Sequence, residues 1–132
     1  MREASSPGQR SAPSVRAIRG ATTLAKDTKE EVLLRTAELL RVMMERNRLD
    51  ADDLISVFFT ATEDVSSEFP AAAAREIGLS QVPLLCAREI PVEGSVRLCV
   101  RVLAHCYASA DARQARHVYL RGARRLRTDL GS

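Results

Sequence analysis

The sequence has few of the residues on which several functional classes depend. Its 132 residues include no tryptophan, two tyrosines and three phenylalanines, so there is little material for stacking nucleic-acid bases on aromatic side chains. The basic residues are spread among acidic ones and leave a net charge of only +3, which also disfavours nucleic-acid binding. No apolar run approaches the roughly 20 residues that a membrane-spanning helix needs. We therefore expect a soluble protein that has neither nucleic acid nor a membrane as its partner.

Cysteine is also scarce. Cys86, Cys99 and Cys106 are odd in number, lie in or beside apolar runs and show no CxxC spacing, so neither a disulfide framework nor a zinc site is indicated. Residues 1–14 are rich in Ser, Pro, Gly and Arg but lack the apolar segment of a secretory signal. We expect these residues to form a disordered extension, and a reducing cytoplasm to be the location.

Lysine is nearly absent as well, and arginine takes its place. Lys26 and Lys29 are the only lysines among 20 basic residues, which leaves 18 arginines. The guanidinium group is a planar fork that matches a carboxylate or a phosphate. Codon bias in a GC-rich genome is the other explanation for the excess, and composition alone does not separate the two.

The length favours one domain, which we place at residues 15–127, followed by a flexible tail at 128–132. Apolar periodicity predicts a mixed five-stranded sheet with helices on one face, an α/β or α+β fold. A single sizeable helix would leave the other sheet face uncovered, so a symmetric oligomer is expected. The predicted strands cover 15–20, 54–61, 81–87, 96–105 and 117–126, the last interrupted at Gly122, and the predicted helices cover about 28–47 and 69–78.

The longer predicted helix has a clear start and a clear apolar face. Thr28 and Glu31 have the spacing of a capping box. An apolar stripe at spacings of three and four residues should face the core, and it comprises Leu33, Ala37, Leu40 and Met44, flanked by Val32, Thr36 and Met43. The preceding residues 21–26 are expected to form a loop. Residues 54–61 are apolar enough for a strand buried on both faces.

The predicted strand at 96–105 carries an unusual charge. Arg101 lies in mid-strand between Cys99 and Leu103, on the face opposite to the apolar series of the strand. A buried guanidinium needs an anion, either a protein carboxylate or an anionic ligand. Glu89 follows shortly after the preceding predicted strand, and a hairpin through Gly94 would bring it near Arg101. An edge strand with a solvated or carboxylate-paired Arg101 is the simpler alternative.

Six short motifs, in order and in register from about Val15 to Leu130, resemble the monofunctional, trimeric α/β class of chorismate mutase. They are Ile18 to Thr23, Phe69-Pro70-Ala71, the Val82-Pro83 strand leading to Cys86 and Glu89, Cys99 to Val102, Arg116 to Leu120, and Leu126-Arg127. The resemblance implies a trimeric pseudo-α/β-barrel with active sites between subunits. It also implies conversion of chorismate to prephenate, without a cofactor or a metal, in the biosynthesis of phenylalanine and tyrosine.

The resemblance assigns roles to individual residues. Arg101 would donate to the breaking ether oxygen and to a carboxylate, Arg19 and Tyr119 would bind a carboxylate, and Glu89 would accept a hydrogen bond from the ring hydroxyl. The remaining substrate-binding residues are Cys86 beside Glu89, Phe69 and Ala71 from the adjoining subunit, Leu84, Leu85 and Leu126 as lining, and Arg75 and Arg127 as cations at the mouth. Three positions depart from the family pattern: Ala72 replaces a lysine, Leu85 a threonine and Thr128 a proline.

The chemistry of such an enzyme agrees with what the sequence lacks. A unimolecular [3,3] rearrangement needs no nucleophile or metal, and the sequence offers no convincing Ser-His-Asp set, glycine-rich phosphate loop or metal cluster. The enzyme must hold a flexible dianion compact and stabilise charge that grows on the ether oxygen. A non-catalytic trimer that binds another small carboxylate is the alternative function.

Overall fold

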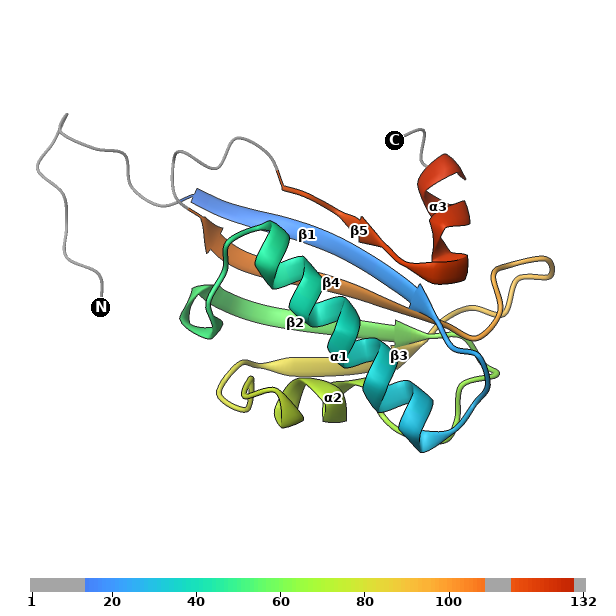
Figure 1. Ribbon diagram of the computed structural model, residues 1–132. Helices are drawn as coiled ribbons and strands as arrows, with labels where there is room; N and C mark the ends of the chain where they lie inside the picture. The colour runs from blue at the N-terminus through green and yellow to red at the C-terminus, as the bar shows by residue number, and fades with distance from the viewer. Residues whose placement is uncertain (1–13, 109–114, 130–132) are drawn as a thin grey trace, which may run out of the picture.

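The computed structural model describes residues 14–108 and 115–129 and contains one mixed five-stranded sheet (Figure 1). The strand order is β3-β2-β4-β1-β5. The strands are β1 (Ser14–Thr23), β2 (Leu54–Ala61), β3 (Leu84–Arg88), β4 (Cys99–Ala108) and β5 (Val118–Tyr119). The helices are α1 (Lys29–Arg46), α2 (Pro70–Glu76) and α3 (Arg124–Asp129), with single 3-10 turns η1 (Ala51–Asp53) and η2 (Arg121–Ala123). The predicted five-stranded mixed sheet is confirmed.

Strand β4 lies at the centre of the sheet, and the predicted hairpin between the third and fourth strands is wrong. β4 pairs antiparallel with both β1 and β2, while β3 lies on the far side of β2 and runs parallel to it. The glycine that suggested a tight turn does have a positive φ of 85° at Gly94. The apolar ten-residue β4 is nevertheless paired along both edges by the long strands β1 and β2, so the short β3 is left at the sheet edge.

Helix α1 begins where its sequence predicted. The Thr28 side chain accepts a hydrogen bond from the Glu31 amide at 3.2 Å, which caps the first turn. The Glu31 carboxylate accepts instead from the Ala25 amide at 2.8 Å, so only half of the expected capping box forms. The buried face is rotated slightly from the prediction, because Leu33 and Met44 are only partly buried. The buried residues are Val32, Thr36, Ala37, Leu39, Leu40 and Met43.

Two further strand predictions need correction. β1 continues through residues 21–23, which pair with β4, so the expected loop begins later. After β5 the chain turns helical in η2 and α3, so the predicted strand at 123–126 is wrong. The buried Ala123 and the partly buried Leu126 are three residues apart, which is a helical spacing, with exposed Arg124 and Arg125 between them.

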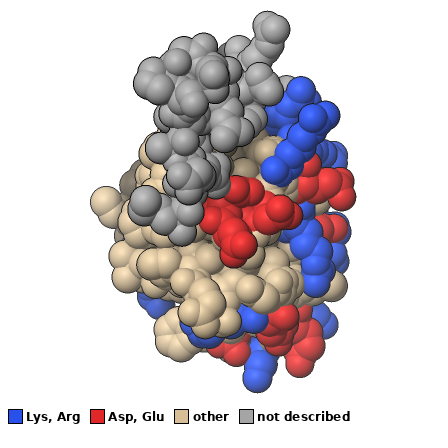
Figure 2. Space-filling view, turned by 90° about the vertical axis from the view of Figure 1, so that its left-hand side faces the viewer, with Lys and Arg blue, Asp and Glu red and all other residues tan. Residues whose placement is uncertain are grey.

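The helices α1 and α2 cover one face of the sheet (Figure 1), and α3 lies against β5 at the opposite edge from β3. The face away from α1 exposes several large apolar side chains, among them Val15, Phe58 and Leu85. β2 is therefore buried on one face only within this chain, contrary to the prediction. Seen from the left-hand side of Figure 1, most of the charged side chains in view lie toward one side and the lower edge, with an acidic group near the middle (Figure 2).

Among the described residues, no helix is both long enough and apolar enough to cross a membrane. The predicted N-terminal extension lies outside the described residues except for Ser14, which already begins β1. Of the predicted tail, residues 128 and 129 belong to α3, and 130–132 lie outside the described part.

Candidate active site

The candidate site is a row of residues that crosses the sheet on the face away from α1. Arg101 of β4 is paired with Thr60 of β2 on one side and with Ala21 of β1 on the other, and Ala21 is paired with Tyr119 of β5. Paired residues in a sheet project from the same face. Three strands distant in sequence thus place a hydroxyl, a small side chain and a phenol in line with Arg101. We call these four residues, Thr60, Arg101, Ala21 and Tyr119, the Arg101 row.

Glu89 lies in contact with Arg101 although their strands are not neighbours. The chain leaves β3 and the Glu89 amide donates to the Ala61 carbonyl at 2.9 Å, which brings Glu89 across the end of β2. There the Thr60 hydroxyl donates to Glu89 Oε2 at 2.6 Å, and Arg101 Nε lies 3.0 Å from the same oxygen. The side chain of Glu89 is only 16% exposed. The expected proximity of the pair is therefore present, through β2 and not through a hairpin.

The guanidinium of Arg101 is only partly used by the described residues. Its side chain is 41% exposed, whereas its Nε is buried and, although it lies 3.0 Å from Glu89 Oε2, makes no hydrogen bond with a described residue. Buried polar atoms are rarely left without a partner. A cation held in this way by the sheet retains donors for an anion that approaches the open face.

Tyr119 also has a buried polar atom, its hydroxyl oxygen, that makes no hydrogen bond to the described residues. The ring packs against a small cluster that contains Ala21, Cys99 and Leu126, so α3 supports the row from the β5 side. Burial raises the pKa of the Cys99 thiol to about 11 against the opposing influence of Arg101, so Cys99 is a neutral neighbour of that cation.

Arg19 lies on the same face, two residues before Ala21, and its side chain is exposed. Its backbone amide donates to His117 Nδ1 at 3.0 Å. Burial, with a smaller contribution from the Arg19 charge, lowers the pKa of His117, which keeps the imidazole neutral and able to accept. His117 thus links β1 to the chain just before β5.

The other expected site residues lie elsewhere in this chain. Cys86 and Leu84 face the covered side and pack against the main core, whereas Leu85 is exposed beside Phe58 on the open face. Within α2, Ala71 is buried and Arg75 is exposed, and Phe69, the residue before the helix, is 68% exposed. Arg127 belongs to α3, but its side chain lies outside the described part.

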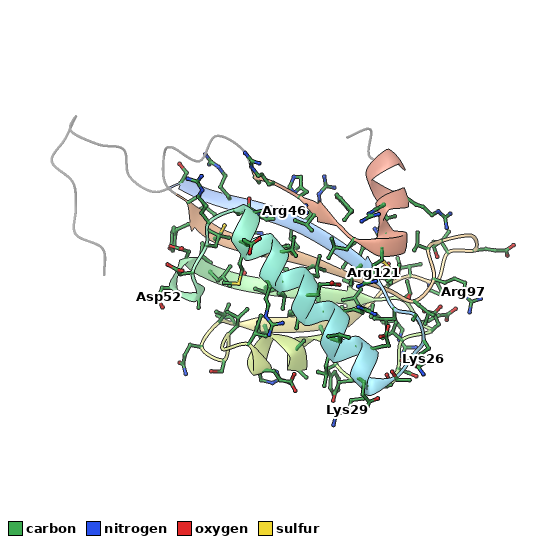
Figure 3. All side chains as sticks on the ribbon, viewed as in Figure 1. Lys26, Lys29, Arg46, Asp52, Arg97 and Arg121 are labelled. Atoms are coloured by element: carbon green, nitrogen blue, oxygen red, sulfur yellow. The ribbon has the colours of Figure 1, made fainter. Side chains whose placement is uncertain are left out.

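A cavity of about 320 Å³ adjoins the site on the side of Glu89. Its lining includes Thr62, Asp64, Glu89 and Arg97 but not Arg101. Arg97 and Lys26 lie toward this end of the sheet, and Arg46 and Asp52 toward the other (Figure 3). Sequence reasoning missed Thr60, whose hydroxyl donates to Glu89, and Thr62 and Asp64, which line this cavity. Their signal was a polar series at the end of an apolar strand.

The comparisons with known proteins agree on one family. The family model for chorismate mutase type I matches residues 15–130. The chain belongs to the type I chorismate mutase family. It is 51% identical over 119 residues to the chorismate mutase AroH of Thermus thermophilus, a match that covers 89% of this chain and 98% of that protein. It is 40% identical over 117 residues to AroH of Bacillus subtilis strain 168, covering 88% and 92% of the two chains.

A solved structure confirms the same fold for this chorismate mutase. A chorismate mutase from Clostridium thermocellum superposes with a TM-score of 0.80 at 45% sequence identity, and the match covers 83% of this chain and 97% of that one. The family resemblance inferred from the six motifs is therefore confirmed. Within this fold, the pairing of Thr60 with Arg101 and the ion pair of Arg101 with Glu89 bring charged and polar side chains together on an uncovered face of the sheet.

Proposed function

We propose that this chorismate mutase converts chorismate to prephenate at the Arg101 row. The observation that carries the proposal is the ion pair of Arg101 and Glu89 on the uncovered face of the sheet, where Nε is buried and has no hydrogen-bond partner among the described residues. The substrate has two carboxylates, an ether oxygen and a ring hydroxyl. Arg101 and Arg19 match the anionic groups, and Glu89 matches the hydroxyl as an acceptor.

The rearrangement is unimolecular, so the residues act by holding and by electrostatics. Arg101 donates to the ether oxygen, whose negative charge grows as the carbon–oxygen bond lengthens, and this donation stabilises the transition state more than the ground state. Arg19 and the Tyr119 hydroxyl hold a carboxylate and keep the flexible substrate compact. Glu89, fixed by Thr60, orients the ring hydroxyl and holds Arg101 in place.

The proposal includes a homotrimer that closes the site. The uncovered face exposes apolar side chains such as Phe58 and Leu85, which association would bury. Phe69 and Arg75 lie on or beside α2, which covers the other face of the sheet. In a pseudo-barrel trimer they would be contributed by the neighbouring subunit, Phe69 as a wall and Arg75 with Arg127 as cations at the mouth. Ala71 and Cys86 are packed in their own core, which leaves mainly their backbone for substrate contact.

A steady-state assay with purified protein tests the activity, because turnover removes the absorbance of chorismate. Binding of chorismate without turnover would instead favour the alternative, a small-carboxylate-binding protein of the same fold. We further propose that the enzyme is cytoplasmic and serves phenylalanine and tyrosine biosynthesis. Growth without these amino acids, in a host whose own mutase is deleted, tests the pathway.

Complementation between subunits tests the shared site. Arg101→Ala and Phe69→Asp would each inactivate all three sites of a trimer. When the two variants are co-expressed and mix at random, about a quarter of the sites combine an intact Arg101 with an intact Phe69 from the neighbour. Recovery of about that fraction of wild-type kcat supports the shared site. If mixed trimers are verified and remain inactive, Phe69 of one subunit does not complete the site of its neighbour.

A further inference from the structure

The backbone just before β4 is held in an unfavourable conformation. Leu98 has a φ of +48°, in the left-handed region, where a Cβ atom crowds the backbone. Residues other than glycine persist there only when their surroundings hold them. Leu98 immediately precedes Cys99, the first residue of β4, and lies three residues before Arg101.

The carboxylate of Asp64 holds Leu98. The Leu98 amide donates to Asp64 Oδ1 at 3.0 Å and to Oδ2 at 3.1 Å. On its other side the Leu98 carbonyl accepts from the Leu24 amide at 2.8 Å. The Leu98 side chain packs against the buried cluster that contains Leu24 and Val65. Both backbone polar groups of the strained residue are therefore engaged.

Thr62 connects this carboxylate to the first residue of the strand. Its hydroxyl donates to Asp64 Oδ1 at 2.6 Å and accepts from the Cys99 amide at 2.9 Å, while the Thr62 amide donates to the Cys99 carbonyl at 3.0 Å. Thr62 is buried, so water competes little for these hydrogen bonds. Asp64, Thr62, Leu98 and Cys99 thus form one hydrogen-bonded unit, which we call the β4 clamp.

We propose that Asp64 is a positioning residue for Arg101 and acts through the β4 clamp. This rests on the proposed function of Arg101 as the donor to the ether oxygen. The left-handed turn at Leu98 sets the backbone direction at which β4 begins, and the clamp fixes Cys99 on the face that Arg101 shares. The same stretch of chain fixes the partner of Arg101, since Thr60 donates to Glu89. Residues 60–64 therefore position both charges of the site.

The clamp has a distinctive kinetic signature. In Asp64→Ala the amide of Leu98 loses its acceptor, Leu98 relaxes and Arg101 is displaced. We expect kcat to fall about 10-fold, because displacements of an ångström or less are costly to catalysis, while KM changes less than twofold. Asp64→Asn, which keeps one acceptor oxygen, should lie between. Leu98→Gly added to Asp64→Ala should restore most of the lost kcat, because glycine adopts positive φ without assistance.

Controls separate the clamp from the proposed function. Asp52→Ala removes an exposed acidic charge at the other end of the sheet (Figure 3) and should leave kcat unchanged. Leu98→Gly alone should keep kcat but lower the melting temperature, because it removes packing. Arg101→Ala tests the proposed function itself. If Arg101→Ala loses activity while Asp64→Ala keeps the wild-type kcat, the clamp proposal is wrong and the proposed function stands. If Arg101→Ala keeps the wild-type kcat, the proposed function is wrong.

A second pair of variants covers the case in which Asp64→Ala does not fold. Thr62→Val removes the bridging hydroxyl with little change of shape, and Thr62→Ser retains it. The clamp predicts a lower kcat for Thr62→Val and a near wild-type kcat for Thr62→Ser. Equal kcat for the two folded variants, or a loss in Asp64→Ala that Leu98→Gly does not restore, would overturn the proposal.

Discussion

Arg101 and Glu89 form an ion pair, with Nε and Oε2 3.0 Å apart, across the end of a strand to which neither belongs. The intervening β2 supplies Thr60, whose hydroxyl binds the same carboxylate oxygen at 2.6 Å. Thr60 and Arg101 thus share one carboxylate oxygen of Glu89. Arg101 is therefore placed by an anion without being saturated by it, which suits a group that must still donate to a substrate.

Arg101→Ala removes the donor for the developing oxyanion. We expect kcat to fall at least about 100-fold, the scale for losing one preorganised donor. Arg101→Lys should recover only part of this loss, because an ammonium group cannot reproduce the planar fork. Steady-state kinetics on both variants, with trimer formation checked by light scattering, provides the measurement. A folded Arg101→Ala enzyme with unchanged kcat would exclude the assigned role.

Tyr119→Phe separates a substrate contact from a structural one. The hydroxyl is buried and has no partner in the part of the chain that the structure describes, so its removal should leave stability unchanged or raise it by up to about 1 kcal/mol. Loss of a hydrogen bond to a carboxylate should raise KM about 10-fold or more. Thermal unfolding and kinetics on the same preparation measure both effects. A clear drop in melting temperature would mean that the hydroxyl has a protein partner in the assembled enzyme.

The sequence predicted helix and strand ends well where the signal comes from neighbouring residues. The bounds of β2, the Thr28 cap of α1 and Pro70 at the start of α2 all follow from residues within a few positions of one another. The charge anomaly at Arg101 also required an anion, and the structure supplies Glu89. These inferences depend on periodicity, caps and desolvation, which act over short stretches.

The strand predicted at 123–126 was a misread local spacing, whereas the main error concerns pairing between distant segments. Consecutive β3 and β4 looked like a hairpin, but β2 lies between them, and no local pattern encodes which strand is inserted. The left-handed conformation of Leu98 could not be predicted either, since leucine gives no signal for positive φ. The residue that holds it, Asp64, lies 34 positions away. Site residues that act through such contacts are found only from coordinates.

Gly20→Ala should destabilise the packing of α1 on β1. A Cβ at Gly20 would overlap Met43 Sδ and approach Leu39 Cδ1 to 3.1 Å, and both side chains are buried. We expect a loss of about 1–3 kcal/mol, the usual cost of overpacking. Urea unfolding of Gly20→Ala, Met43→Ala and the double variant provides a cycle. The double variant should lose less than the sum of the single losses, and strict additivity would show that the methyl group does not meet Met43.

His117 gives the stability of the β1–β5 edge a defined dependence on pH. Its Nδ1 accepts from the Arg19 amide only while the imidazole is neutral. Burial lowers the pKa of His117 in the folded protein, so the unfolded chain binds the proton more readily. The stabilisation is therefore complete above the unfolded pKa of about 6.5 and is lost as the pH falls through the lower folded pKa. The urea midpoint of the wild type should fall between pH 8 and pH 5 by more than that of His117→Asn, which retains an acceptor but does not titrate. Equal pH dependence of the urea midpoint in the wild type and in His117→Asn would refute the role of His117.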